Sequence, residues 1–483
     1  MPLFSVQKAG LFLGLLFSSV CLHAQQFLPQ DYLTPAFHKG RREAARAAMP
    51  DSSVMVIFAA PVRNFANDVD YLYHQNPDLY YFTGFKEPNS ILLLFKEPQT
   101  DSAGAKFSEL FFVQERDARA EHWNGRRLGV KGVQERLGIT NVLTNNTFNS
   151  YSINLAGISK IITEGFPKGM INERGTADLF DLTESFKSKA GIADEKDTRL
   201  DRRLFQEITT GLREIKTSEE LSLLRKAIEI SCIGQNEVMK TVSPDMSELE
   251  IQGLHEYVHK KYGAEGVGYG SIIGAGENGC ILHYTENSRT KIGTETLLMD
   301  VGAEYHGYTA DVTRTIPAKG KFSPEERKIY QLVYDAQEAA FKILKQGSKW
   351  SDASVAAREV IANGLVTLGL IKDKKEVGRY YTHGLGHHIG LDVHDKGSYG
   401  ALKKDMVLTI EPGIYISPES PVDKKWWGIA VRIEDDVLIK EDGYELLSSF
   451  APRSIEAIEK LMAEKSVIDN FKLPPLQSAK KSF

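Results

Sequence analysis

The segment of residues 296–317 holds two aspartates, Asp300 and Asp311, that could act together. Runs of β-forming residues flank a turn at His306 and Gly307, and the aspartates lie about equally far from it. A hairpin would place them on neighbouring strands at close rungs. Their neighbours in sequence are apolar, and burying two like charges is costly without a compensating cation. A metal ion is the simplest such cation. The alternative is that one aspartate faces solvent and the other caps a turn.

Two glutamates stand in similar apolar surroundings further along the chain. Glu411 lies in the run 408–416, in an apolar strand that ends at Pro412 and Gly413. Glu434 lies in the run 429–439, two residues after Arg432. The period of a strand puts Arg432 and Glu434 on one face. A single buried acid usually marks an ion pair, and Arg432 with Glu434 could be only that. Four acids in three strand contexts favour a shared cation site instead.

Histidines cluster in the segment 382–395, which contains His383, His387, His388 and His394. Gly384 and Gly386 make a helix unfavourable there. The glutamate that follows the first histidine in zincin helices is also missing. The pattern predicts a glycine-rich strand or loop that presents histidines at a cleft. A structural polar network is the alternative for this cluster taken alone.

Four carboxylates and one imidazole form an oxygen-rich set of metal donors. Such a set suits Mn²⁺ or a similar divalent ion better than a thiolate-type zinc site. Carboxylates can bridge two cations about 3.5–4 Å apart, and such a pair activates water and polarises a peptide carbonyl. The chain carries no GxGxxG or P-loop motif for a nucleotide. Its net charge of −5 does not indicate nucleic acid or an anionic membrane as a partner.

The helices and strands that must position these residues are predicted to differ between the two halves of the chain. In the first half, the runs 54–60, 91–95 and 110–113 predict buried strands, because each is apolar and bounded by turn-forming residues. Helical patterns lie between them, so this half is expected to be α/β.

The second half is predicted to hold long capped helices that alternate with strands. Thr217 with Glu220 has the spacing of a capping box before a helical stretch at 220–240. Ser247 with Glu250, and Ser323 with Glu326, repeat that spacing, and Pro324 suits the first helical position. The expected organisation is an N-terminal domain over 25–205, a second domain over 206–465 and a polar tail over 466–483.

Residues 1–24 have the features of a signal peptide. A mostly apolar stretch follows Lys8, and Ala24 is a small residue at a plausible cleavage point. The stretch is shorter than the roughly 20 residues that span a bilayer. Cys21 raises the alternative of a lipoprotein, which Val20 directly before it disfavours. The mature protein is therefore expected to be exported, periplasmic or secreted, without insertion into a membrane.

Several stretches together resemble the metallopeptidases of the pita-bread fold, which include creatinase, methionine aminopeptidase, prolidase and Xaa-Pro aminopeptidase. Within this group the chain most resembles the bacterial Xaa-Pro aminopeptidases. The stretches in the second half are GAGENGCILHYTEN (274–287), MDVGAEYHGYTADVTRTIP (299–317), HGLGHHIGLDVHD (383–395), EPGIYI (411–416) and RIEDD (432–436). Those in the first half are NPDLYYFTGFKEP (76–88) and WNGRRLG (123–129). The resemblance implies a creatinase-like α/β domain followed by a pita-bread catalytic domain, in the α/β (α+β) class.

The resemblance implies that five residues hold two divalent metal ions. Asp300 would bind one ion, His387 and Glu411 the other, and Asp311 and Glu434 would bridge both. Mn²⁺ is the first candidate for the metal, with Co²⁺ and Zn²⁺ as the others. Glu411 would also accept the proton of the attacking water.

The same resemblance assigns further residues to the cleft. His283 and His394 would contact the substrate and stabilise the tetrahedral intermediate, and His383 would line the side that receives proline. Arg432 would hold Glu434 and an acidic part of the local network. Tyr415 is a further cleft residue. Asp78 is a candidate for closing one end of the cleft, and it could equally be a turn residue.

His388 follows the expected ligand His387 directly, so it is predicted to face away from the metals and to be structural. Trp123, in the WNGRRLG segment, could serve a subunit contact or a neighbouring cleft, and a homo-oligomer, dimer or tetramer, is implied.

The implied activity is release of the first residue from peptides with proline in second position, by attack of a hydroxide that bridges two metals. The alternatives are a prolidase, which cuts only dipeptides, and a pita-bread protein that binds peptides without cutting them. Creatinase-type chemistry fits less well, because it does not need the full ligand set.

Overall fold

The computed structural model of the protein describes residues 29–101, 104–153, 155, 157–172, 177–470 and 473. The chain divides into two compact units, residues 1–34 and 35–483. In the first unit, residues 29–34 are described and form neither helix nor strand. The predicted signal peptide, Cys21 and most of the predicted tail lie outside the described residues. Among the described helices, none combines the length and the apolar character needed to cross a membrane.

A mixed sheet forms the centre of the N-terminal part, with the strand order β6-β5-β4-β1-β7-β8. The bounds of its strands are β1 Ser53–Phe58, β4 Ile91–Thr100, β5 Lys106–Val113, β6 Val142–Thr144, β7 Lys160–Ile162 and β8 Leu200–Asp201. β1 pairs antiparallel with β4 and parallel with β7, and all six of its residues are buried. The strands predicted at 54–60, 91–95 and 110–113 are confirmed as β1, β4 and β5. Their apolar runs are continuous because the sheet is covered on both faces at its centre.

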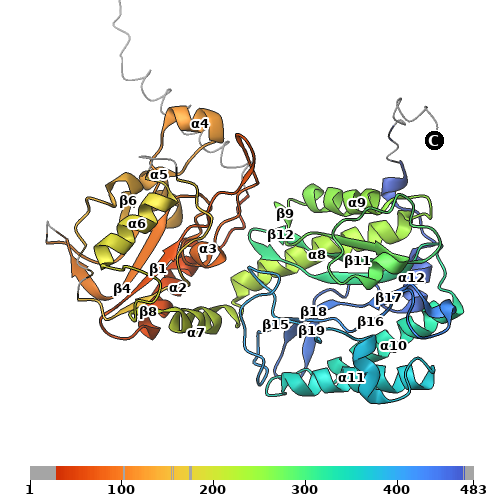
Figure 1. Cartoon of the computed structure of the whole chain (residues 1–483). Coiled ribbons are helices and arrows are strands. Elements are labelled where there is room, and N and C mark those ends of the chain that lie inside the picture. Colours follow the sequence, from red (N-terminus) through yellow and green to blue (C-terminus); the bar gives the residue numbers. More distant parts are fainter. Residues whose placement is uncertain are drawn as a thin grey trace, which may run out of the picture. The chain divides into compact units, whose positions relative to one another are not determined.

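Helices lie between these strands along the sequence, as predicted for an α/β domain (Figure 1). Their bounds are α2 Pro35–Ala48, α3 Pro77–Thr83, α4 Ala118–Asn124, α5 Gly129–Leu137, α6 Leu179–Ala190 and α7 Arg202–Arg213. A short exposed ribbon, β2 Asn64–Ala66 with β3 Val69–Asp70, stands apart from the sheet. The domain boundary expected at 205/206 falls within α7, and that division stays a prediction.

Four long helices frame the C-terminal part, with α8 and α9 on one side of the strands and α10 and α11 on the other (Figure 1). Their bounds are α8 Ser218–Thr241, α9 Glu248–Lys261, α10 Pro324–Phe341 and α11 Trp350–Thr367. The capping boxes predicted at Thr217 and Ser323 are both formed, with Pro324 in the first turn. Ser247 caps α9 through the Glu250 backbone amide. An extensive apolar core lies between these helices and the strands they cover.

Short antiparallel sheets fill the space between the helices. Their orders are β10-β11-β14, β13-β12-β9, β15-β18-β19 and β16-β17. The bounds are β9 Gly266–Val267, β10 Ile272–Ala275, β11 Thr296–Val301, β12 Ala303–Tyr305, β13 Tyr308–Thr309, β14 Val312–Pro317, β15 Val407–Ile410, β16 Gly413–Ile416, β17 Ile429–Arg432, β18 Asp435–Ile439 and β19 Tyr444–Leu446. A last helix, α12, spans Ile455–Leu461. The mixed helix and strand fold class is confirmed.

The hairpin predicted around His306 and Gly307 is present. β12 and β13 form its tip, where Tyr305 pairs with Tyr308 and both turn residues have positive φ, as a two-residue hairpin turn requires. β11 and β14 form its base, with Asp300 opposite Thr313. Asp311 lies one residue before β14, at the point where the ladder is interrupted.

The glutamates occupy interruptions too. Glu411 lies between β15 and β16, beside the strand end predicted at Pro412 and Gly413. Glu434 lies between β17 and β18, whereas it was expected inside a continuous strand. A break in the ladder frees both side chains from the alternation of a strand, so that they can turn toward Asp300 and Asp311.

Two buried histidines of α9 should make the fold sensitive to acid. His255 and His259 have no hydrogen-bond partner for any ring nitrogen among the described residues, and burial lowers their pKa values to about 3 and about 4. Because these values lie below about 6.5 for an unfolded histidine, stability is full above pH 6.5 and falls as the pH drops toward 4.

We expect the variant His255→Leu to lose about 2 kcal/mol less unfolding free energy between pH 7 and pH 5 than the wild type. Urea unfolding at the two pH values measures this difference. The matched variant His122→Leu, at an exposed position of α4, should change nothing. An equal acid-dependent loss in His255→Leu and the wild type would contradict the assignment.

Candidate active site

A cavity of about 450 Å³ in the C-terminal part gathers most of the residues singled out in the sequence. All five expected metal ligands line it, and so do four further expected site residues: His283, His383, His394 and Arg432. Tyr415 and Asp78 are not among the lining residues. Strands, loops and two strand interruptions, from His283 to Glu434 in the sequence, therefore converge on one space.

Three of the expected ligands form a compact group of donor atoms. One atom each of Asp311, His387 and Glu434 lies within 4.8 Å of the others. His387 Nε2 lies 3.4 Å from Asp311 Oδ2 and 3.6 Å from Glu411 Oε1, which adds the second glutamate. Asp300 joins through Tyr269, whose hydroxyl oxygen lies 2.5 Å from Asp300 Oδ1 and 2.6 Å from Asp311 Oδ1.

The acids are crowded and buried enough to require a cation. Burial, followed by the neighbouring acids, raises the pKa values of Asp311 and Glu434 well above their usual range. Burial also raises the pKa of Glu411 to about 7. Among the described residues, Arg432 is the only arginine or lysine that pairs with any of the four acids. Divalent cations would supply the missing positive charge, and an oxygen-rich set with one imidazole is a donor set that suits them. The residues therefore fit the metal ions that the fold implies.

Arg432 contacts the acidic network through Asp300. Its Nη2 donates to Asp300 Oδ2 at 2.6 Å, and its Nη1 donates to the Tyr415 hydroxyl at 2.9 Å. It reaches Glu434 only through Thr313, whose hydroxyl donates to Glu434 Oε2 at 2.5 Å. The expected direct contact with Glu434 is not formed, because the strand interruption after Arg432 breaks the alternation on which that part of the prediction rested.

The three cleft histidines surround the acids from different elements. His383 lies in the loop before β15, where its Nε2 is 2.8 Å from the Tyr415 hydroxyl, and burial lowers its pKa to about 4. His394 lies in the same loop, and its ring meets that of His387 edge-on at 4.3 Å between centroids. His283 follows β10, and its side chain is exposed at the cavity. The segment 383–395 is a loop rather than a helix, as its glycines predict.

His388 and Asp78 both lie outside the cavity. His388 is buried, its Nε2 lies 2.9 Å from the carbonyl oxygen of Ser398, and it does not line the cavity. It faces away from the acids as expected. Asp78 is buried in the first turn of α3, where it pairs with Arg213 at 2.8 Å and Lys396 at 2.6 Å. It therefore anchors elements outside the cavity and does not take the expected place at the end of the cleft.

Sequence reasoning missed several residues that contact the ligands. Tyr269 touches both aspartates, and no pattern in its surroundings signals this. Thr313 and Thr409 lie two residues from Asp311 and Glu411, but strand alternation does not extend across the interruptions at these acids, so it does not place the threonines beside them. The Thr409 hydroxyl accepts from the His387 backbone amide at 3.0 Å.

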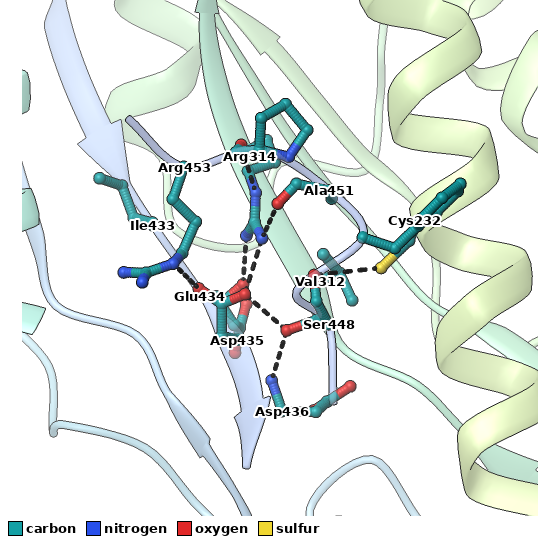
Figure 2. A network of polar contacts seen from close by, with 12 residues as sticks. Cys232, Val312, Arg314, Ile433, Glu434, Asp435, Asp436, Ser448, Ala451 and Arg453 are labelled. Atoms are coloured by element: carbon teal, nitrogen blue, oxygen red, sulfur yellow. Dashed lines mark hydrogen bonds and ion pairs between the residues drawn. The ribbon is translucent and has the colours of Figure 1, made fainter. Parts of the chain in front are cut away.

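A buried arginine holds the backbone next to Glu434 (Figure 2). Arg314 is fully buried, pairs with Asp435 at 2.6 Å, and donates to the carbonyl oxygen of Glu434 at 2.6 Å. Asp435 also accepts from the Ser448 hydroxyl at 2.5 Å. These bonds tie β14, which follows Asp311, to the strand interruption that carries Glu434.

Comparison with known proteins agrees with this geometry. Residues 222–441 match metallopeptidase family M24, and residues 38–162 match the N-terminal domain of aminopeptidase P. The chain is 35% identical to the Xaa-Pro aminopeptidase of Escherichia coli over 434 residues, which cover 87% of this chain and 96% of that protein.

Two solved structures share the fold of most of the chain. One is aminopeptidase P from E. coli with the inhibitor Pro-Leu, at a TM-score of 0.78 and 34% identity, covering 89% of this chain and 98% of that one. The other is the Pseudomonas aeruginosa aminopeptidase PepP, at a TM-score of 0.79 and 33% identity, covering 90% and 99%. The chain therefore belongs to metallopeptidase family M24, in which it joins an aminopeptidase P N-terminal domain to a pita-bread domain.

Proposed function

We propose that the protein is an Xaa-Pro aminopeptidase, which releases the first residue of peptides that have proline in second position. One observation carries the proposal: the five metal-binding candidates and three cleft histidines line a single cavity. The similarity to aminopeptidases P over most of the chain supports the preference for proline.

Five residues would hold two divalent ions: Asp300, Asp311, His387, Glu411 and Glu434. A pair of such ions, when bound, lowers the pKa of water and polarises a carbonyl group. His283 and His394 face the cavity, where a ring N–H can donate to the oxygen of the tetrahedral intermediate. A carboxylate oxygen of Glu411 can take up a proton and pass it to the leaving proline nitrogen. Arg432 keeps Asp300 oriented through its hydrogen bond. The Tyr415 hydroxyl contacts both Arg432 and His383 and so helps to orient their side chains.

A set of short peptides tests the substrate class. We expect cleavage of Xaa-Pro-Xaa tripeptides after the first residue, and no cleavage of matched Xaa-Ala-Xaa tripeptides. Cleavage of Xaa-Pro dipeptides alone would indicate a prolidase instead. Binding of peptides without cleavage by metal-loaded protein would indicate the non-catalytic alternative.

We propose Mn²⁺ as the metal, with Co²⁺ and Zn²⁺ as the other candidates, since oxygen donors predominate among the five ligands. Adding Mn²⁺ to chelator-treated protein should stabilise the fold by about 2.7 kcal/mol at 100 times its dissociation constant. Thermal unfolding with and without each metal measures this effect. Equal midpoints with and without every divalent ion would contradict a metal site.

We further propose that the protein is exported to the periplasm or medium and forms a homo-oligomer, a dimer or tetramer. The sequence features of residues 1–24 support export, with cleavage after Ala24 and without lipidation of Cys21. Trp123, 79% exposed on α4, supports a subunit contact. Sequencing of the native N-terminus tests the first point, and a retained Met1 would refute it. Light scattering after gel filtration tests the second.

A further inference from the structure

We infer that two fully buried glutamines, Gln235 and Gln337, are positioning residues for the metal-binding acids. Each side-chain amide joins the two chain segments that carry the acids of one half of the site. The inference rests on the proposed two-metal site. The two glutamines do not line the cavity, and neither has been given a role in the proposed function.

The first glutamine serves the two aspartates. Gln235 projects from α8, and its Nε2 donates to the backbone oxygen of Met299 at 3.0 Å and to that of Val312 at 2.8 Å. Met299 directly precedes Asp300, and Val312 directly follows Asp311. One NH₂ group therefore spans β11 and β14 beside both carboxylates.

The second glutamine repeats this arrangement for the two glutamates. Gln337 projects from α10, and its Nε2 donates to the backbone oxygen of Ile410 at 2.8 Å and to that of Ile433 at 3.1 Å. Ile410 directly precedes Glu411, and Ile433 directly precedes Glu434. All four carbonyl groups that the two amides bind thus adjoin an expected metal ligand.

The surroundings fix the orientation of Gln337 more firmly than that of Gln235. Gln337 Oε1 accepts from Arg453 Nη1 at 2.8 Å, and its Nε2 also lies 2.9 Å from Asp435 Oδ2. Figure 2 shows Arg453 beside the segment from Ile433 to Asp435 that this amide binds. Gln235 Oε1 is buried and has no partner among the described residues, so its amide bonds go to the two carbonyls alone.

The physical need for such bonds follows from the interrupted strands. The ladders end beside the acids: Val312 pairs with Val301, and Ile410 pairs with Asp435. Asp311, Glu411 and Glu434 stand just beyond these last rungs, where strand pairing no longer holds the backbone. A buried carbonyl without a donor is costly, and one NH₂ with two hydrogens satisfies a carbonyl on each segment. The same two bonds set the spacing of the segments, and with it the spacing of the carboxylates. Groups that orient metal ligands in this way usually affect metal affinity about 10- to 100-fold when they are replaced.

The test compares Gln235→Met and Gln337→Met with a matched variant in each helix. Asn236→Leu removes a side-chain amide of α8 that donates to the Phe450 carbonyl at 3.0 Å. Gln331→Met removes a side-chain amide of α10 that donates to Asp335 Oδ1 at 2.8 Å. Neither Phe450 nor Asp335 adjoins an expected ligand, so both controls lose a hydrogen bond remote from the metal-binding acids.

The readouts are Mn²⁺ binding to metal-free protein by calorimetry, the visible absorption spectrum of the Co²⁺-loaded protein, and metal-free unfolding. We expect Gln235→Met and Gln337→Met to bind Mn²⁺ about 10- to 100-fold more weakly and to shift the Co²⁺ bands, while the controls stay within about twofold of the wild type. Metal-free stability should fall in both and in Asn236→Leu. Wild-type affinity in Gln235→Met and Gln337→Met, or an equal loss of affinity in the controls, would overturn the inference.

The outcome is separable from that of the proposed function. A wild-type protein that binds Mn²⁺ but cuts no peptide would refute the peptidase, and the affinities would still decide the role of the glutamines. A wild type that binds no divalent ion would overturn the inference as well. If the methionine variants do not fold, Gln235→Asn, whose amide is one methylene shorter, gives the same comparison.

Discussion

Replacing Asp311 with asparagine should abolish peptide hydrolysis while leaving the metal-free protein folded. Asp311 lies in the compact donor group with His387 and Glu434, and its carboxylate is expected to bridge both ions. A metal pair contributes several kcal/mol to such a reaction, so we expect kcat/KM to fall by about 10³-fold or more. The substitution also removes one charge from a group of buried acids. The midpoint of metal-free thermal unfolding should therefore stay equal or rise, and Mn²⁺ should no longer raise it.

The matched control for this prediction is Asp178→Asn in the N-terminal part. Asp178 is buried and caps α6 through the Asp181 backbone amide, a role that asparagine fills equally well. Its variant should retain wild-type kcat/KM and the response to Mn²⁺. An Asp311→Asn protein that still hydrolysed peptides at a near wild-type rate would show that Asp311 does not hold the metals.

Replacing Arg213 with methionine should cause a large loss of stability. The guanidinium is buried at the end of α7 and pairs with three carboxylates, those of Asp78, Asp392 and Asp395, at 2.8, 2.8 and 2.5 Å. Removing one partner of a buried ion pair leaves an uncompensated charge and typically costs about 3–5 kcal/mol. Urea unfolding followed by circular dichroism measures this loss.

An exposed ion pair in the same helix supplies the comparison. Arg203 pairs with Glu207 one turn away, and their side chains are 89% and 54% exposed. Arg203→Met should lower the unfolding free energy by less than about 1 kcal/mol, because water screens and solvates both charges. Lys216 pairs with Asp395 at 2.7 Å, and Lys396 pairs with Asp78. Equal losses in the two variants would mean that these lysines compensate the buried acids without Arg213.

Local elements could be predicted well because their signals lie within a few residues. The capping boxes at Thr217 and Ser323 specify where α8 and α10 begin, and the continuous apolar run of β1 specifies a central strand. The hairpin at His306 and Gly307 follows from its turn residues. Gly384 and Gly386 excluded a helix for the histidine segment, and the structure has a loop there.

The interruption at Glu434 could not be predicted in this way. Glu434 lies in an apolar run that looks like a continuous strand, whereas Pro412 and Gly413 mark the end of the strand that carries Glu411. Arg432 illustrates the consequence. Strand alternation predicted that Arg432 pairs with Glu434. The strand ends after Arg432, however, and its guanidinium binds Asp300, which belongs to another sheet. Asp78 likewise pairs with Arg213 and Lys396, and no local pattern in the sequence predicts that these residues lie near it.

By itself, the sequence determined which residues are available for chemistry: four acids in apolar surroundings, a histidine-rich loop and the motifs of a metallopeptidase family. The cost of burying a charge explains why these acids stand out in the sequence, since an acid in an apolar run needs a compensating partner in any fold. Only the tertiary structure decided which group is that partner. Ion pairs, the tyrosine between two aspartates and the paired glutamines depend on distances between segments that are far apart in the chain. Those distances are set by how helices and interrupted strands pack together, which no local pattern encodes.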